Sequence, residues 1–283
     1  MDLNLLTLKK IIEGFLYEDI GSGDITTNSI VPPDAGSQGY IIAREDGVVA
    51  GLPLTEMVFQ MLDPEIAFRA LAQDGQKIEC SMVLAEISGN ARAILTGERI
   101  ALNLLQHLSG IATRTARLVE LVGGNKPRIV DTRKTTPGLR MVEKYAVRVG
   151  GGYNHRFGLF DAVLIKDNHI KIAGGIRAAV EAARRGSPHT ARIEVEVEDF
   201  AGVGEALSAG ADIIMLDNMT PDRMREAVAL IAGRALVEAS GGVSEANIRA
   251  VAEAGVDLIS VGALTHSVRS LDISLDIKEI KRR

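Results

Sequence analysis

The chain has 283 residues, of which 46% are hydrophobic and 24% charged, and its formal net charge is −5. This length allows one large domain or two moderate ones, and no apolar run approaches the ~18 residues of a membrane span. The low aromatic content and the absence of Trp disfavour broad nucleic-acid binding. The single cysteine, Cys80, excludes an intrachain disulfide, so we expect a cytoplasmic protein.

The first hundred residues are predicted to form an α+β domain, because strand and helix patterns do not alternate regularly there. Apolar spacing predicts an amphipathic helix at the N-terminus, and a stretch rich in Gly, Pro, Asp and Ser predicts a loop. The predicted elements are a helix at 1–20, a loop at 18–39, a hairpin at 38–51, a helix at 53–62 with Thr55 as a candidate N-cap, and strands at 67–72 and 83–89.

A long helical pattern follows from Ala91 to Gly124, where Leu95, Leu102 and Leu105 recur at helical intervals. We expect this stretch to join two domains. Arg99 lies inside it, and from the residues alone it is interpreted as an exposed helix arginine.

Beyond Gly124 short β-branched runs alternate with helical patterns, which predicts parallel strands with right-handed crossovers. The predicted strands are 128–131, 162–166, 192–197, 212–216, 235–239 and 257–262, and a helical segment follows each of the first five. Six parallel strands are compatible with a barrel or with a doubly wound sheet.

Two features favour a barrel, although an incomplete one, since the standard form has eight strands. Polar residues such as Asp217 and Ser240 follow the carboxyl ends of the strands, where (β/α) barrels build their sites. In addition, Glu194 and Glu196 share one side of a strand, and such carboxylates would be costly in a sheet covered on both faces.

The window from Asp131 to Lys171 is locally basic, with eight Lys or Arg residues against four acids. Such a concentration of positive charge in an acidic chain indicates an anionic ligand. The candidate receptors are Arg133, Lys134, His155, Arg156 and Lys166. A structural role for His155 and a Schiff-base role for Lys166 are the alternatives, and His169 is expected to cap a helix.

The later strands end in residues that suit phosphate and metal. Ser240 and Gly241 open one glycine-rich turn and Gly262 another, and both turns can present backbone N–H groups to a phosphate. Glu196 and Asp217 end consecutive strands, where carboxylates can hold Mg²⁺ together with substrate phosphates. No P-loop or H-E-x-x-H motif is present.

Several motifs together resemble the quinolinate phosphoribosyltransferase family over nearly the whole chain. They are EDIGSGDITT, GERIALNLLQHLSGIAT, DTRKTTPGLR, GGGYNHRFGL, LIKDNHI, EVEVE, LDN, ASGGV and VGALTHS. The resemblance implies an α/β sandwich at 1–108, which the tail at about 270–283 rejoins, and an incomplete (β/α) barrel catalytic domain at 109–269.

The resemblance further implies a Mg²⁺-dependent enzyme that joins quinolinate to phosphoribosyl pyrophosphate (PRPP), releases CO₂ and forms nicotinate mononucleotide for NAD biosynthesis. Quinolinate would be held by Arg133, His155, Arg156 and Lys166, and by Arg99 from the second subunit of a homodimer. Lys134, Glu196 and Asp217 would serve PRPP, Mg²⁺ and catalysis, and Ser240, Gly241 and Gly262 would bind the 5′-phosphate. The alternatives are a transferase acting on nicotinate or another pyridine acid, a Schiff-base lyase and a phosphometabolite sensor without catalysis.

Overall fold

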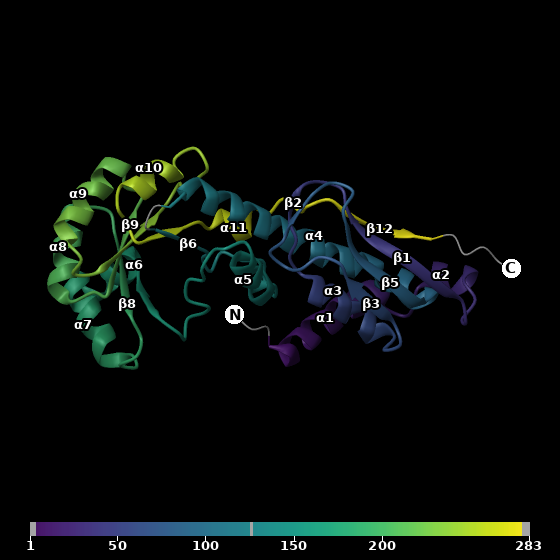
Figure 1. Ribbon diagram of the computed structural model, residues 1–283. Helices are drawn as coiled ribbons and strands as arrows, with labels where there is room; N and C mark the ends of the chain where they lie inside the picture. Colours follow the sequence, from purple (N-terminus) through teal and green to yellow (C-terminus); the bar gives the residue numbers. More distant parts are fainter. Residues whose placement is uncertain (1–3, 125–126, 279–283) are drawn as a thin grey trace. The chain divides into compact units, whose positions relative to one another are not determined.

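Figure 1 shows the computed structural model of the chain, in which residues 4–124 and 127–278 are described. The described residues form two compact units. The first lies within Met1–Ala116, Pro137–Gly151 and Ser267–Arg283, and the second within Arg117–Thr136 and Gly152–His266. The division comes after residue 116, whereas the predicted boundary comes after residue 108, and the segment Pro137–Gly151 belongs to the first unit.

The first unit contains a four-stranded antiparallel sheet in the order β12-β1-β5-β3. Its strands are β1 (Gly36–Ala43), β3 (Ala67–Ala70), β5 (Val83–Asn90) and β12 (Ile273–Ile277). β12 pairs along β1, so the C-terminal segment returns to this sheet, as the family resemblance implied. The short strands β2 (Gly47–Val48) and β4 (Lys77–Ile78) form a separate pair.

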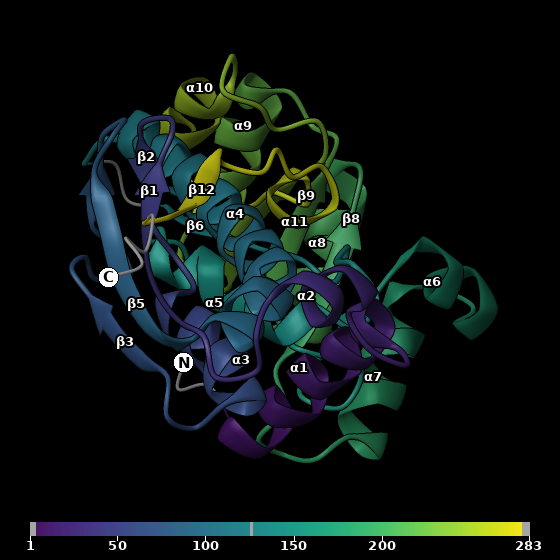
Figure 2. The same cartoon turned by 90° about the vertical axis from the view of Figure 1, so that its right-hand side faces the viewer.

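Helices α1 (Leu5–Ile20) and α3 (Leu52–Leu62) and the first part of α4 (Ala91–Val122) cover one face of this sheet (Figure 2). They bury apolar side chains such as Ile12, Phe59 and Leu105 against the strands. Burial of this kind contributes about 25 cal/mol per Å² of apolar surface and is the main stabilisation of the unit.

Three predictions for the first unit are wrong in detail. The predicted hairpin at 38–51 does not form, since β1 and β2 lie in different sheets. Thr55 is not an N-cap: Gly51 occupies that position, and the buried Thr55 hydroxyl donates to its carbonyl. The predicted loop also contains a short helix, α2 (Ile25–Ile30), which the Asp24 carboxylate caps at the backbone N–H of Thr27.

The long helical pattern forms one continuous helix, α4, and the short α5 (Arg140–Val149) packs with it in the first unit. The buried Glu143 carboxylate of α5 lies 2.9 Å from His107 Nε2 on α4. The Tyr145 hydroxyl donates to Asp74 at 2.7 Å. Within residues 4–124 and 127–278, neither α4 nor any other helix has the length and apolar content needed to cross a membrane.

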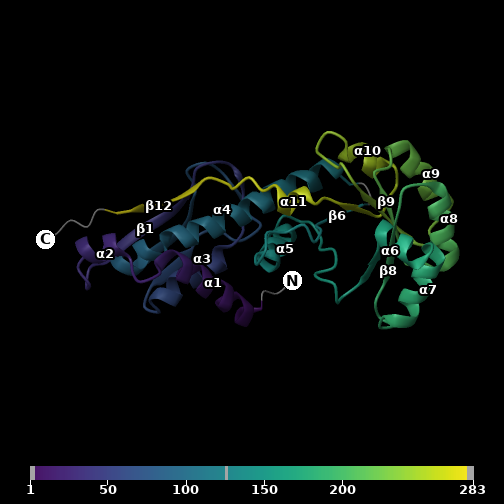
Figure 3. The same cartoon turned by 180° about the vertical axis from the view of Figure 1, so that it is seen from behind.

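The second unit is built on six parallel strands in the order β6-β11-β10-β9-β8-β7, which confirms all six predicted strands. They are β6 (Arg128–Val130), β7 (Val163–Ile165), β8 (Ile193–Val197), β9 (Ile213–Asp217), β10 (Leu236–Ser240) and β11 (Leu258–Ser260). The helices of this unit are α6 (Asp167–Ala173), α7 (Ile176–Gly186), α8 (Phe200–Ala209), α9 (Pro221–Ile231), α10 (Ile248–Glu253) and α11 (Ala263–His266). α7, α8 and α9 lie along the outside of the sheet, where α7 packs on β7 and β8, α8 on β8 and β9, and α9 on β10 (Figure 3).

The six strands follow one another around the sheet, and β6 and β7 are its two edges in the described part of the chain. A single extended residue, Tyr153, pairs with the free side of β6. Its N–H donates to Ile129 at 2.8 Å, and its carbonyl accepts from Asp131 at 3.1 Å. The barrel is therefore incomplete, as predicted, and the segment around Tyr153 lies at its open seam.

Two glycines in helices of the first unit offer a test of this packing. Gly14 in α1 has open space where a Cβ would stand, so Gly14→Ala should stabilise the protein by about 0.5–1 kcal/mol. A Cβ on Gly110 in α4 would collide with the Arg269 carbonyl, so Gly110→Ala should destabilise it by about 1–3 kcal/mol. Urea unfolding followed by circular dichroism measures both values; a stable Gly110→Ala protein would contradict the packing of α4.

Candidate active site

Alternation along the parallel strands places a set of polar side chains inside the barrel. The register pairs Glu196 with Met215, and Asp217 with Ser240. Since side chains two residues apart share a face, Glu194 lies one layer below Glu196, and Glu238 one layer below Ser240. The interior of the barrel is therefore polar towards its carboxyl end.

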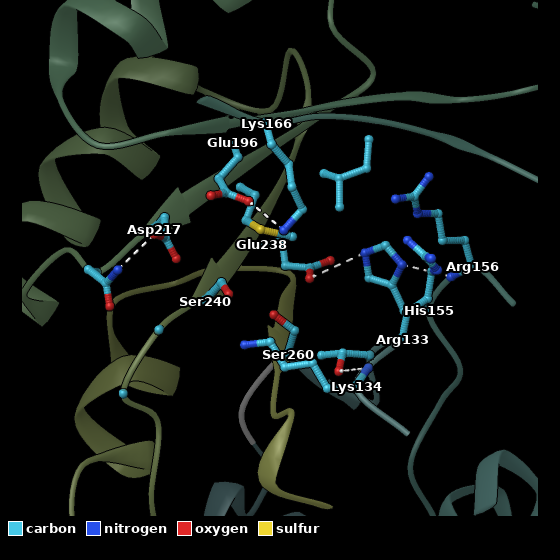
Figure 4. Close-up of a pocket in the computed structure, with 16 residues that line it drawn as sticks. Arg133, Lys134, His155, Arg156, Lys166, Glu196, Asp217, Glu238, Ser240 and Ser260 are labelled. Atoms are coloured by element: carbon cyan, nitrogen blue, oxygen red, sulfur yellow. Dashed lines mark hydrogen bonds and ion pairs between the residues drawn. The ribbon is translucent and has the colours of Figure 1, made fainter. Parts of the chain in front are cut away.

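A cavity of about 570 Å³ opens at this end, within the size range of small-ligand sites. Its walls contain nearly all of the predicted site residues, and all of them come from the second unit (Figure 4). The lining residues are Thr132, Arg133, Lys134, His155, Arg156, Leu164, Lys166, Glu196, Met215, Asp217, Asn218, Glu238, Ser240, Gly241, Gly242 and Ser260. Gly262 adjoins them, because a Cβ there would be 3.1 Å from Lys134 Cδ.

Arg99 is the predicted site residue that belongs to the other unit. It is exposed on α4, as expected from the residues alone. Its predicted role in a second subunit's site stays a prediction.

The Asp131 carboxylate at the end of β6 holds the basic side of the cavity in place. It is fully buried and accepts hydrogen bonds from the Asn154 side chain at 2.6 Å and from the His155 backbone N–H at 2.8 Å. A buried carboxylate must be paired in this way to offset the loss of its hydration. The residues after Asp131 and the residues after Asn154 are thereby brought to one wall.

Arg133 and Arg156 are half-buried on this wall, and their charges oppose each other. Burial lowers the pKa of Arg156, and the neighbouring Arg133 guanidinium lowers it further. Arg156 donates to the Ala162 carbonyl at 3.0 Å, but its buried Nε has no hydrogen-bond partner among the described residues. An anion placed here would relieve both the repulsion and the unsatisfied donor.

Below the arginines lies a buried layer of His155, Glu194 and Glu238. His155 Nε2 is 3.0 Å from Glu194 Oε2 and 3.6 Å from Glu238 Oε1, and the two acids are 3% and 1% exposed. Burial, and next the charge of Glu194, raise the pKa of Glu238 to about 8. Burial of this kind favours the neutral carboxylic acid form of Glu238.

Glu238 was missed by the sequence analysis. Its position two residues before Ser240 on one strand was the signal that would have placed it in the site. Glu194 was noted as an inward acid but not assigned to the site, although it precedes Glu196 by the same spacing.

The ligand atoms of His155, Glu194 and Glu238 lie within 4.8 Å of one another, as in a metal site. The histidine tautomer argues against that interpretation. His155 Nδ1 accepts the Arg156 backbone N–H at 2.7 Å, so the ring proton is on Nε2, the atom that a metal would need. The layer is better described as a hydrogen-bonded support in which His155 donates to Glu194.

The opposite wall of the cavity carries the predicted metal-binding acids (Figure 4). Glu196 lies 3.3 Å from Lys166 Nζ, and Asp217 accepts from the Asn218 side chain at 2.7 Å. The Lys166 side chain is 48% exposed and ion-paired, so it lacks the apolar surroundings that activate a Schiff-base lysine. His169 accepts the Lys166 backbone N–H at 2.9 Å, which confirms it as a helix cap.

The turn after β10 needs a glycine at its start. Gly241 has a φ of 92°, and a Cβ there would overlap the Asn218 side chain. The Asn218 backbone N–H donates to the Ser240 carbonyl at 2.9 Å, so the ends of β9 and β10 are joined at the cavity.

Comparison with known proteins gives consistent matches over both units. Residues 24–109 match the N-terminal domain of quinolinate phosphoribosyl transferase, and residues 111–276 match its C-terminal domain. A protein named probable nicotinate-nucleotide pyrophosphorylase (carboxylating) from Bacillus subtilis is 47% identical over 275 residues, covering 97% of this chain and 95% of that protein. One with the same name from Synechocystis is 48% identical over 269 residues, covering 94% and 91%.

Solved structures agree with these matches. The crystal structure of NadC from Streptococcus pyogenes is 44% identical to this chain and superposes with a TM-score of 0.94. The similarity covers 99% of this chain and 100% of that one.

The raised pKa of Glu238 makes stability depend on pH. Folded protein keeps this proton up to about pH 8, whereas an ordinary Glu loses it near 4.5, so stability should fall as pH rises across that window. Glu238→Gln removes the effect. The free energy of unfolding of Glu238→Gln, compared with that of wild type at the same pH, should rise by up to about 1.4 kcal/mol for each pH unit between pH 5 and pH 8, as measured by urea unfolding. Glu198→Gln, at an exposed position, is the control, and its stability should depend on pH as that of wild type does. If the stability of all three proteins depends on pH in the same way, Glu238 is not a buried neutral acid.

Proposed function

The chain belongs to the quinolinate phosphoribosyl transferase family, and on this premise we propose that its barrel cavity joins quinolinate to PRPP. The reaction gives nicotinate mononucleotide, pyrophosphate and CO₂ for NAD biosynthesis, and the enzyme is a nicotinate-nucleotide pyrophosphorylase (carboxylating). The observation that carries this assignment is the half-buried pair Arg133 and Arg156, whose like charges repel each other on one wall of the cavity.

Quinolinate carries two carboxylates next to each other on a pyridine ring. Arg133 and Arg156 offer planar forks that match carboxylates, and Arg156 Nε is left to be satisfied. Lys166 extends the positive side of the cavity towards the acids. A dicarboxylate offsets this charge better than a monocarboxylate does, so the site favours quinolinate over nicotinate.

The acidic wall suits the other reactant. When the quinolinate ring nitrogen attacks ribose C1 and pyrophosphate leaves, positive charge develops on the ribose ring. Glu196 and Asp217 are negative charges fixed at the ends of β8 and β9, where they stabilise that charge. Lys134 and the turns at Gly241 and Gly262 hold the phosphates, because backbone N–H groups and an ammonium lie together there.

The donor set of the acidic wall also fits Mg²⁺. This ion is bound through one or two carboxylates together with substrate phosphates, and Glu196 and Asp217 supply carboxylates beside the phosphate turns. When bound, Mg²⁺ neutralises charge on the pyrophosphate leaving group. Lys166 pairs with Glu196 and keeps that carboxylate oriented into the cavity.

The alternative functions have less support. A Schiff-base lyase needs a desolvated lysine, and Lys166 is exposed and paired with Glu196. A sensor without catalysis has no need for two acids opposite the anion site. A cytoplasmic location remains our proposal, because a chain with the single Cys80 shows no adaptation to an oxidising compartment.

One assay tests the function and the metal together. Wild-type protein mixed with quinolinate, PRPP and Mg²⁺ should release CO₂ and nicotinate mononucleotide in equal amounts. EDTA should remove the activity, and excess Mg²⁺ should restore it. Replacing quinolinate with nicotinate should lower kcat/KM by at least about 100-fold, because one carboxylate is lost from the paired arginines. Equal rates with nicotinate would contradict the assignment.

We also propose that the enzyme is a homodimer in which Arg99 completes the quinolinate site of the second subunit. This assignment comes from the family resemblance, and the exposure of Arg99 on α4 is compatible with it. A third arginine would balance the second carboxylate of the substrate.

Dimers that contain one subunit of each of two variants test whether Arg99 acts in the site of the second subunit. Arg99→Ala and Arg156→Ala should each raise the quinolinate KM strongly. Unfolding and refolding the two variants together should restore about a quarter of the intact sites, because half of the dimers are hybrids with one complete site each. The measurement is the rate at low quinolinate concentration. If the mixture is no more active than its parts, Arg99 does not act across subunits.

A further inference from the structure

The proposed reaction consumes a proton that none of the assigned residues supplies. When the bond between ring carbon C2 and the carboxylate breaks, CO₂ leaves and the electron pair stays on C2. That carbon must then take up one proton to give the product. The proton has to be delivered at the floor of a cavity whose other side chains are assigned to quinolinate, PRPP and Mg²⁺.

We propose that the Glu238 carboxyl group donates this proton to C2, and that water entering from the opposite side of the buried layer returns it. The step forms a C2–H bond, breaks the O–H bond of Glu238 and leaves a Glu238 carboxylate. This inference rests on the proposed function, since it names the proton source for that same reaction.

The position of Glu238 suits this role. It lines the cavity from β10, in register with Met215 on β9 and Leu258 on β11. Figure 4 shows it between the Lys166–Glu196 pair on one side and His155 on the other. In the binding mode proposed above, the ring nitrogen faces the acidic wall and the carboxylates face the arginines, so C2 would lie between these walls, next to Glu238.

Glu238 is also in the right protonation state. Its carboxyl group is 1% exposed, and Oε1 has no hydrogen-bond partner among the described residues. Burial and the neighbouring Glu194 carboxylate favour the neutral acid, and they hold its pKa near the working pH, where general acids are most effective.

The neighbouring groups are poorer donors. Arginine does not lose its proton in proteins. His155 holds one ring proton, since Nδ1 accepts the Arg156 N–H, and that proton is directed at Glu194. Lys166 is exposed and paired with Glu196 at the opposite wall.

A second cavity gives Glu238 access to water from below. It has a volume of about 320 Å³ and is lined by residues at the amino ends of the strands, including Arg128, Ile213 and Leu258. The two cavities share His155, Arg156 and Glu238, so these residues separate them. Glu238 can thus regain a proton while the upper cavity is still occupied by product.

The test compares pyrophosphate release with CO₂ release in wild type, Glu238→Gln and Glu238→Asp. Quinolinate labelled at the 2-carboxylate reports CO₂. The glutamine keeps the size and neutrality of the acid but cannot donate to carbon. We expect CO₂ release to fall at least about 100-fold in Glu238→Gln, because a C2 carbanion that is not protonated recaptures the CO₂ before it leaves the site; this is within the usual contribution of general acid catalysis. First-turnover pyrophosphate and the quinolinate KM should change less than about threefold, so phosphoribosyl quinolinate accumulates.

Glu238→Asp retains a carboxyl group and should recover part of the lost CO₂ release. Glu198→Gln, an exposed acid that follows β8, is the matched control and should behave as wild type. The proposal is overturned if Glu238→Gln releases CO₂ at the wild-type rate, if CO₂ and pyrophosphate fall together, or if only the quinolinate KM rises, as a mere support for His155 would predict. Failure of the wild-type protein to form nicotinate mononucleotide would instead overturn the proposed function.

Discussion

The site depends on one buried carboxylate. Asp131 ends the edge strand β6, and it binds the Asn154 side chain and the His155 backbone across the open seam of the barrel. An unpaired carboxylate at this depth would be costly, so the two segments must stay together for the fold to be stable. The basic residues after Asp131 and those after Asn154 face one cavity for this reason.

The second constraint is charge balance without substrate. The basic wall keeps Arg133 and Arg156 close together, and the layer below it keeps two carboxyl groups next to one histidine. One acid, Glu194, accepts from His155, and the other, Glu238, stays protonated. The cavity therefore combines a net attraction for anions with a floor that is close to neutral. Such an arrangement suits the proposed binding of a dicarboxylate and the proposed donation of a proton by Glu238.

The open seam of the barrel lies beside the charged residues of the site. Tyr153 pairs with only part of β6, so the seam leaves room for a second cavity below the buried layer. A closed barrel of eight strands fills its interior with side chains in layers. In this barrel, polar side chains and two cavities occupy part of the interior that such a layer would fill. The helices α7, α8 and α9 cover the outside (Figure 3). The rigid strands hold the acids, and the loops hold the cations.

The sequence by itself determined the six parallel strands, the polar residues at their carboxyl ends and the family. These depend on local hydrophobic periodicity and on motifs that are continuous in the chain. It wrongly predicted a hairpin at 38–51 and an N-cap at Thr55, because the partners of β1 and β2 are distant in the chain and the buried Thr55 hydroxyl donates to the Gly51 carbonyl. Only the tertiary structure decided that α5 joins the first unit and that Glu238 faces His155. Those outcomes depend on which side chains meet across strands and helices far apart in sequence, and on the burial that keeps Glu238 protonated.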